Sequence, residues 1–263
     1  MRKERNFDQL MISFSGGRSS AMMLYKMIED GSAQNAVVCF ANTGKERNET
    51  LDFVQKCDEE WGGGNMIKWL EFDLDTKFRL VNWETASRDG KPFSELIGKK
   101  KYPPNVVTRF CTQELKIRVI KNYMLSLGFN NWTSVLGIRL DEPNRYFRGL
   151  EAAKKDRWEV SMPMYSKYFI KKEDVDIFWK KQPFDLQLKS YEGNCDLCFL
   201  KGVNKLKRIM KENPESYKWW SLQEKNNTFI KGISYSTLNQ KAQSSLNLPY
   251  DDSDDFQCFC NID

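Results

Sequence analysis

The sequence predicts an α/β fold in which a Rossmann-like parallel sheet is flanked by helices and followed by a more helical C-terminal region. Two observations predict it: strand and helix patterns alternate through the first half of the chain, and the pattern becomes more helical and richer in Trp and Lys from Asp141 onward. Strands that alternate with helices form right-handed βαβ units, whose parallel strands are covered on both faces. Ligands of such sheets bind at the carboxyl ends of the strands.

Each expected element has its own local signal. Short apolar runs predict strands over residues 10–15, 36–41, 66–74 and 132–138. Apolar or amphipathic runs predict helices over residues 20–30, 48–61 and 112–127. Glycine, a common helix-ending residue, directly follows each of the three.

The domain organisation follows from two breaks in this alternation. Residues 75–109 contain Gly90, Pro92 and the pair Pro103–Pro104, and are expected to form an insertion or lid. The change of pattern at Asp141 predicts a boundary there. We therefore expect a sheet domain over residues 1–140 and a helical region over residues 141–263.

The composition is that of a globular protein, with 40% hydrophobic and 29% charged residues. No apolar run approaches the roughly 20 residues that a membrane span needs. The first ten residues include basic side chains but no apolar signal core. The sequence therefore predicts a cytoplasmic protein without a membrane partner.

Cysteine and histidine counts exclude several kinds of chemistry. The chain has seven cysteines and no histidine. An odd number of cysteines without an export signal favours free thiols, a metal or a cluster over disulfides. Without histidine, Ser–His–Asp and Cys–His catalysis are excluded, as is zinc bound through imidazole.

The positive charge is unevenly distributed. Residues 99–121 contain seven basic residues and one acidic residue, and residues 201–225 contain seven basic and three acidic ones. Such stretches suit a polyanion, either a nucleotide or a nucleic acid, and they are equally typical of solvated helix faces. The oligomeric state is left open, with a homodimer among the candidates.

A glycine- and serine-rich loop, Ser15–Gly16–Gly17–Arg18–Ser19–Ser20, joins the first expected strand to the first helix. Glycines let backbone amides approach an anion, hydroxyls add donors, and a helix N-terminus adds partial positive charge. The loop is neither a Walker A motif nor a G-x-G-x-x-G fingerprint. It therefore predicts a phosphate site, with a plain small-residue turn as the alternative.

The loop resembles the S-G-G-x-D-S loop of PP-loop proteins, in the branch of the phosphoadenosine phosphosulfate (PAPS) reductases. Four further stretches in matching order are similar to motifs of that branch: FANTG at 40–44, RFCTQELK at 109–116, GIRLDEPNR at 137–145 and DVDIFW at 174–179. The resemblance covers roughly residues 11–220. It departs at Ser19, where the family loop has an acidic residue.

The resemblance implies an adenine nucleotide alpha hydrolase-like fold whose loop grips the phosphates of ATP or of an adenylylated substrate. Implied nucleotide-binding residues are Ser13, Ser15, Gly16, Gly17, Arg18, Ser19, Ser20, Asn42, Thr43, Gly137 and Arg139. Implied catalytic residues are Arg18, Arg139 and Asp141. Asp141 and Glu142 could hold Mg²⁺, and the alternative for both is a structural turn before Pro143.

The cysteines form three groups. Cys39 and Cys57 fall on apolar positions and are expected to be inert core thiols. Cys195 and Cys198 form a C-x-x-C, which alone fits a zinc half-site, a redox dithiol or half a cluster site. Cys111 opens the third expected helix, where helix polarity and Arg109 should stabilise its thiolate. Cys258 and Cys260 end the chain.

Four cysteines outside the core form an all-thiolate set, namely Cys111, Cys195, Cys198 and Cys260 or Cys258. A 4Fe–4S cluster is held by four cysteine thiolates, and members of the resembled branch carry such clusters. A structural zinc and unmetallated thiols remain as alternatives. The reductases of the branch pair two cysteines where this chain has Phe110–Cys111, and their tail cysteine precedes a histidine that is absent here.

Together these features predict an enzyme of sulfur transfer or sulfonucleotide chemistry that uses ATP or an adenylylated substrate. One alternative is a thiol-dependent PAPS or APS reductase without a cluster, with Cys258 or Cys260 as nucleophile. A sulfur transferase would act on a nucleic-acid acceptor or receive sulfur from a donor protein. Ser19 favours a third alternative, a catalytically silent nucleotide- or nucleic-acid-binding module. Trp158, Trp179, Trp219 and Trp220 are expected to pack a helical core rather than stack on bases.

Overall fold

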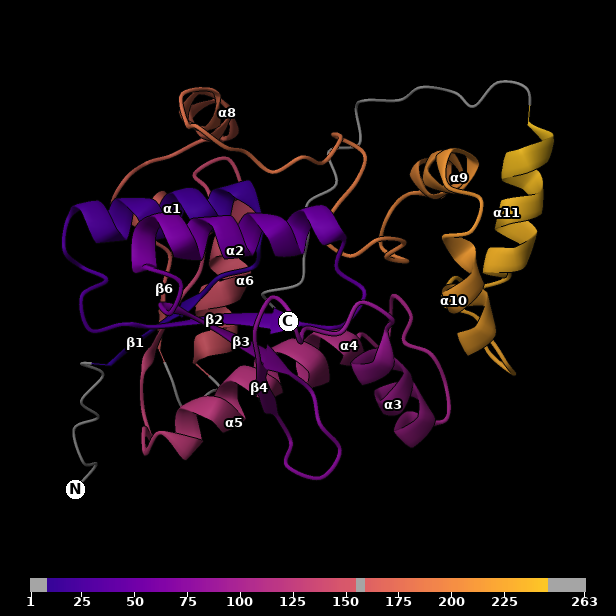
Figure 1. Ribbon diagram of the computed structural model, residues 1–263, viewed down its shortest axis with the longest axis horizontal. Coiled ribbons are helices and arrows are strands. Elements are labelled where there is room, and N and C mark those ends of the chain that lie inside the picture. Colours follow the sequence, from indigo (N-terminus) through magenta and orange to yellow (C-terminus); the bar gives the residue numbers. More distant parts are fainter. Residues whose placement is uncertain (1–8, 155–158, 246–263) are drawn as a thin grey trace.

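A six-stranded sheet lies at the centre of the computed structural model, which describes residues 9–154 and 159–245 (Figure 1). The strands are β1 (Leu10–Ser13), β2 (Val37–Asn42), β3 (Ile67–Glu71), β4 (Arg79–Val81), β5 (Thr133–Val135) and β6 (Glu159–Ser161). Helices cover both faces of the sheet. The predicted α/β class is therefore confirmed.

The strand order is β4-β3-β2-β1-β5-β6, and every pair is parallel except β3 with β4. The chain moves outward from β1 through β2 and β3, then returns to place β5 on the other side of β1. The direction of winding thus reverses between β1 and β5. Open α/β sheets bind ligands in the crevice at such a reversal.

Helices account for most of the remaining described chain. They are α1 (Arg18–Glu29), α2 (Asn48–Gly62), α3 (Lys91–Lys100), α4 (Phe110–Thr112), the π-helix η1 (Gln113–Ile117), α5 (Arg118–Ser126), α6 (Pro143–Ala153), α7 (Pro163–Ser166), α8 (Lys172–Lys180), α9 (Val203–Glu212), α10 (Tyr217–Gln223) and α11 (Tyr235–Ser244). The three predicted helices are present, and the third is built from α4, η1 and α5 in succession.

Two apolar cores lie on opposite faces of the sheet. One joins Ile12 and Phe14 to buried side chains of α1, α2 and α8. The other joins Met11 and Cys39 to α3, η1 and α5, and it continues into the C-terminal helices α9 and α11. Alternate residues of one strand thus serve opposite cores, as the pleat of a buried parallel strand requires.

Two segments add strands that the sequence pattern did not show. Within the expected insertion, β4 pairs antiparallel with β3, and α3 follows it. Beyond Asp141, β6 joins the sheet beside β5. Both strands have three residues, too few for a periodic signal.

The C-terminal tryptophans pack as expected where the structure describes them. Trp179 is 2% exposed and Trp220 is fully buried, whereas Trp219 is partly buried. Trp158 lies outside the described residues. None of the helices described here has the length and apolar character to cross a membrane.

Candidate functional site

A pocket of about 260 Å³ lies where the winding of the sheet reverses. One wall is the loop after β1, and Gly137, Glu142 and Arg145 after β5 contribute a second. The remaining wall comes from the chain after α8. The complete lining is Ser15, Gly17, Arg18, Ser19, Ser20, Gly137, Glu142, Arg145, Leu186, Leu188, Lys189, Ser190, Glu192, Gly193 and Asn194.

The loop is held in shape by its own hydroxyls. The Ser15 amide donates to Ser20 Oγ at 3.2 Å, Ser20 Oγ donates to the Gly17 carbonyl at 2.9 Å, and the two serine hydroxyls are 2.9 Å apart. Gly16 has a φ of +76°, and a Cβ there would lie 2.7 Å from Thr50 Cγ2. The loop therefore needs glycine at this position, because a side chain would meet both strain and a clash.

Helix α1 begins directly at the pocket. Its N-cap is Gly17, which supplies no side-chain cap, and its first turn contains no acidic residue. The first amides of a helix have no partner within the helix, and the helix dipole favours an anion beside them. Gly137 packs closely here, because a Cβ on it would lie 3.1 Å from Ser20 Cα. Loop, helix start and the chain after β5 thus form one anion-compatible surface.

Arg18 lines the pocket but is already paired. Its Nε donates to Asp185 Oδ1 at 2.7 Å, its Nη2 contacts Asp185 Oδ2, and its Nη1 lies 3.7 Å from Asp176. This paired fork ties the chain after α8 to the start of α1. A phosphate would have to compete with Asp185 for the guanidinium.

Arg139 and Asp141 form a second pair beside the loop. Arg139 Nε and Nη2 each donate to Asp141 at 3.0 Å, and Arg139 Nη1 donates to Ser19 Oγ at 3.2 Å. Burial opposes ionisation of Asp141, but the hydrogen bonds and charge of Arg139 outweigh it and lower its pKa. Arg139 thus bridges Asp141 and Ser19, the position where the resembled loops have their acidic residue.

Glu142 is buried and held by arginines. Its Oε2 accepts from the Arg139 amide at 3.0 Å, and its Oε1 contacts Arg145 Nη1. Both carboxylates named for Mg²⁺ are therefore engaged by arginine. A magnesium ion there would have to displace those arginines, which favours the structural alternative, a turn before Pro143.

The wall from Leu186 to Asn194 was not anticipated from the sequence. It brings Lys189, Ser190 and Asn194 to the pocket, and Arg145 was likewise not assigned. Asn194 Nδ2 donates to the Ser15 carbonyl at 2.6 Å, which fastens this wall to the loop. The pair Gly193–Asn194 directly before the C-x-x-C was the one local signal for it.

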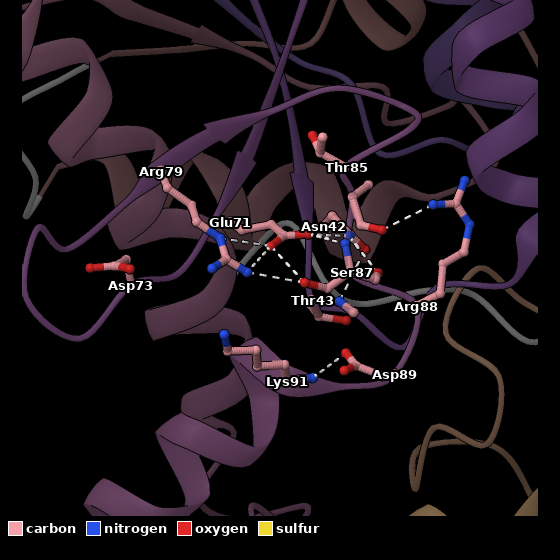
Figure 2. Close-up of polar contacts among 12 residues, drawn as sticks. Asn42, Thr43, Glu71, Asp73, Arg79, Thr85, Ser87, Arg88, Asp89 and Lys91 are labelled. Atoms are coloured by element: carbon pink, nitrogen blue, oxygen red, sulfur yellow. Dashed lines mark hydrogen bonds and ion pairs between the residues drawn. The ribbon is translucent and has the colours of Figure 1, made fainter.

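Asn42 and Thr43 belong to a different network, shown in Figure 2. Asn42 Nδ2 donates to Glu71 Oε1 at 2.6 Å and to the Ser87 carbonyl at 2.9 Å, and its Oδ1 accepts from the Gly44 amide at 3.0 Å. Thr43 is 3% exposed and its hydroxyl donates to Glu46. Among the described residues, the predicted contacts Ser13, Gly16, Asn42, Thr43 and Arg139 are not part of the pocket lining.

Glu71 is the centre of that network and is fully buried. Arg79 donates to its Oε2 through Nε at 3.0 Å and Nη2 at 2.6 Å, and Ser87 donates its amide and its hydroxyl (Figure 2). The carboxylate binds the end of β3 to residues 82–90 and to Asn42. Protein groups thus satisfy both oxygens of the Glu71 carboxylate, which gives this network a structural role.

The C-x-x-C lies next to the pocket wall. Cys195 pairs with Glu46 in an isolated antiparallel bridge, and the Asp196 amide donates to the Lys45 carbonyl at 2.9 Å. The turn after β2 therefore fixes this segment. The thiols of Cys195 and Cys198 are hydrogen-bonded, and Cys111 is close enough for its charge to interact with that of Cys198. The structure thus gathers Cys111, Cys195 and Cys198.

The surroundings of these thiols are cationic but buried. Burial, and after it the charge of Cys198, raise the pKa of Cys111 to about 12 against the opposing charges of Lys116 and Arg109. The expected effect of Arg109 on the Cys111 thiolate is present, because its charge lowers the pKa, but burial of the thiol outweighs it. The hydrogen bond with Cys198, followed by burial, raises the pKa of Cys195. Lys201, 3% exposed, donates to the carbonyls of Cys195 and Asp196.

The remaining cysteines divide as follows. Cys39 and Cys57 are fully buried in the two cores, which confirms them as core thiols. Cys258 and Cys260 lie outside the described residues. Within the described part of the chain, no three cysteine or carboxylate side chains have the arrangement of metal ligands.

Fold and site together define an α/β protein with a glycine-loop pocket at the reversal of its sheet and a group of thiols behind one pocket wall. No family model matches the chain. It is 33% identical over 207 residues to an uncharacterized nin region protein, ORF290, of Escherichia phage lambda, covering 74% of this chain and 67% of that protein. The chain belongs to the same family as this phage protein.

Proposed function

We propose that the protein is a PAPS reductase-like PP-loop enzyme that binds ATP or an adenylylated substrate in the pocket beside α1. The observation that carries this proposal is the convergence of loop, helix start and basic side chains on one pocket. Gly17, the serine hydroxyls and the first amides of α1 would receive the phosphates, and Arg145 and Lys189 add positive charge. A cytoplasmic location is part of the same proposal.

The thiols support a 4Fe–4S cluster as the cofactor. Cys195 and Cys198 are in contact, Cys111 lies within electrostatic reach, and Lys116 and Arg109 favour negative charge on Cys111. Cys260 or Cys258 would be the fourth ligand. When bound, the cluster would deliver electrons or sulfur to the substrate. This chain's own residues would hold the nucleotide, and Lys201 would fix the backbone of the ligand segment.

The pairing of Arg18 with Asp185 gives the loop a role in substrate capture. A bound phosphate would replace the Asp185 carboxylate on the guanidinium, because each anion can accept two parallel N–H bonds from it through a pair of oxygens. Arg139 would then hold Ser19 and Asp141 in place at the pocket's edge. In the sulfur-transferase version of this function, an acceptor oxygen would attack the α-phosphorus of ATP and release pyrophosphate, and a sulfur nucleophile from the donor would then displace AMP from the acceptor.

An acceptor site is suggested by a second hollow of about 580 Å³ beside η1, lined in part by Tyr102, Arg109, Phe110 and Arg118. It lies within the first basic stretch. Aromatic rings beside arginines suit a nucleic-acid base and its phosphate. A nucleic acid is therefore the proposed acceptor, with a sulfur-donor protein as the other partner.

A second candidate function is a silent binding module. The observation favouring it is that Arg18, Arg139 and Arg145 are each paired with a carboxylate beside the pocket. Such a protein would bind a nucleotide without cleaving it. Magnesium-dependent release of pyrophosphate from ATP separates the two: turnover supports the enzyme, and binding without turnover supports the module.

The cofactor is tested by anaerobic purification followed by a visible spectrum and by iron and sulfide analysis. A brown protein that loses its colour in Cys195→Ala, and keeps it in Cys57→Ser, supports the cluster and its ligands. A colourless, iron-free protein would overturn it.

A further inference from the structure

Asn194 belongs to both the pocket and the thiol segment. Its side chain donates to the carbonyl of Ser15 at 2.6 Å and lies against Gly17, whose absent Cβ would be 3.6 Å from Asn194 Nδ2. The backbone carbonyl of Asn194 accepts a hydrogen bond from the Arg47 backbone amide at 2.7 Å. The next residue in the chain is Cys195.

The other side of this segment is fixed by the turn after β2. Besides the backbone contacts of residues 45–47, Lys45 Nζ lies 2.9 Å from Asp196 Oδ2 and Arg47 Nη2 lies 3.1 Å from Glu192 Oε1. Lys45 and Asp196 are both largely buried. Residues 192–196 are therefore held between the turn after β2 and the loop that borders the pocket.

We propose that Asn194 is a positioning residue that couples nucleotide occupancy of the loop to the order of the C-x-x-C segment. A phosphate on Gly17 and the start of α1 fixes the Ser15 backbone, and the amide of Asn194 passes that constraint to Cys195. Coupling of this kind is reciprocal, so occupancy of the thiols changes nucleotide affinity by the same factor. This inference rests on the proposed nucleotide site.

Hydrogen–deuterium exchange of the full chain, with and without saturating ATP, tests the coupling. Three peptides are followed. Residues 13–21 report on the loop, residues 44–48 report on the turn after β2, and residues 195–199 report on the thiol segment. Neither of the last two peptides lines the pocket. In the wild type, ATP should slow exchange in all three. In Asn194→Ala at saturating ATP, protection of residues 44–48 and 195–199, measured relative to protection of the loop, should fall by about fivefold or more.

Matched variants distinguish coupling from loss of structure. Asn194→Gln, which keeps the amide donor, should recover part of the effect, and Asn204→Ala, at an exposed position six residues after Cys198 in the sequence, should behave as wild type. If Asn194→Ala does not fold, Asn194→Leu, which removes the donor at nearly the same size without adding a charge, takes its place.

The outcomes separate the two proposals. If ATP does not protect the loop of the wild type, the nucleotide site itself is wrong and the coupling falls with it. Protection of the loop alone, or undiminished protection of residues 195–199 in Asn194→Ala, would overturn the coupling and leave the nucleotide site standing.

Discussion

The carboxyl end of β1 and the carboxyl ends of β2 and β3 lie along one edge of the sheet, and their polar residues have opposite roles. After β1, the loop Ser15–Ser20 faces a pocket, and its helix start has neither a side-chain cap nor an acidic residue. At the last residues of β2 and β3, Asn42 and Glu71 form hydrogen bonds with each other and with Arg79 and Ser87 (Figure 2). The first end offers donors to an anion, and the second is complete without one.

The comparison teaches that a polar residue after a strand is only a candidate for ligand binding. What decides its role is whether the chain that follows supplies partners. Residues 82–90 cover the end of β3 and satisfy Glu71, whereas residues 186–194 border the end of β1 and leave a space. A buried carboxylate with a cationic partner then stabilises the fold, and a glycine loop with space beside it is available to a ligand.

The largest expected effect is a loss of stability on removing Glu71, at the end of β3. Glu71→Ala removes a fully buried carboxylate that accepts from Arg79 and Asn42 and leaves the Arg79 cation without its counter-ion, so the free energy of unfolding should fall by about 3–5 kcal/mol. Urea denaturation measures it. The exposed Asp75→Ala should change the value by less than about 0.5 kcal/mol. A loss below about 1 kcal/mol for Glu71→Ala would contradict the structural role of this network.

The next effect concerns the stability of the glycine loop after β1. Gly16→Ala should cost about 1–3 kcal/mol of stability, because its positive φ and the contact with Thr50 exclude a side chain. Gly17→Ala should be near neutral, because its φ is −104° and its Cβ would make only ordinary contacts. Thermal unfolding of the two variants compares them directly. Equal destabilisation would show that the loop conformation is not as described.

Arg18 and Asp185 should have opposite effects on ATP affinity. Arg18→Ala should weaken it by about tenfold or more, because a charged donor to phosphate is lost. Asp185→Ala should strengthen it, because the carboxylate that competes for Arg18 is gone. Isothermal titration gives both values, with Lys26→Ala on the far part of α1 as control. Weaker binding in Asp185→Ala would show that Asp185 supports the phosphate site rather than competing for it.

The smallest effect concerns a buried carboxylate without the arginine that Glu71 has. Asp58 Oδ1 accepts from the Met66 and Ile67 amides, yet burial raises its pKa. A raised folded-state pKa means that its contribution to stability is full at low pH and is lost as pH rises. Asp58→Asn keeps the acceptor, so its stability relative to wild type should rise as the pH increases above about 4, the pKa of an unperturbed Asp. A difference independent of pH would count against this.

The parts of the fold with a periodic signal could be predicted from sequence. The loop after β1, the helices α1 and α2 and the central strands follow from apolar patterns and glycine positions. The wall from Leu186 to Asn194 could not, because it has no regular secondary structure and is placed beside the pocket by tertiary contacts such as that of Asn194 with Ser15. The roles of Asn42 and Arg18 likewise depend on Glu71 and Asp185, whose proximity no local pattern reveals.

The central claim is that the open strand end holds an adenosine phosphate, and equilibrium dialysis with labelled ATP tests it most directly. The wild type should bind ATP saturably with a dissociation constant below about 1 mM. Gly17→Val, which fills the loop, should abolish binding, and Gly98→Ala, where a Cβ meets nothing within 4 Å, should leave it unchanged. Absence of saturable binding, or binding that Gly17→Val does not alter, would contradict the claim.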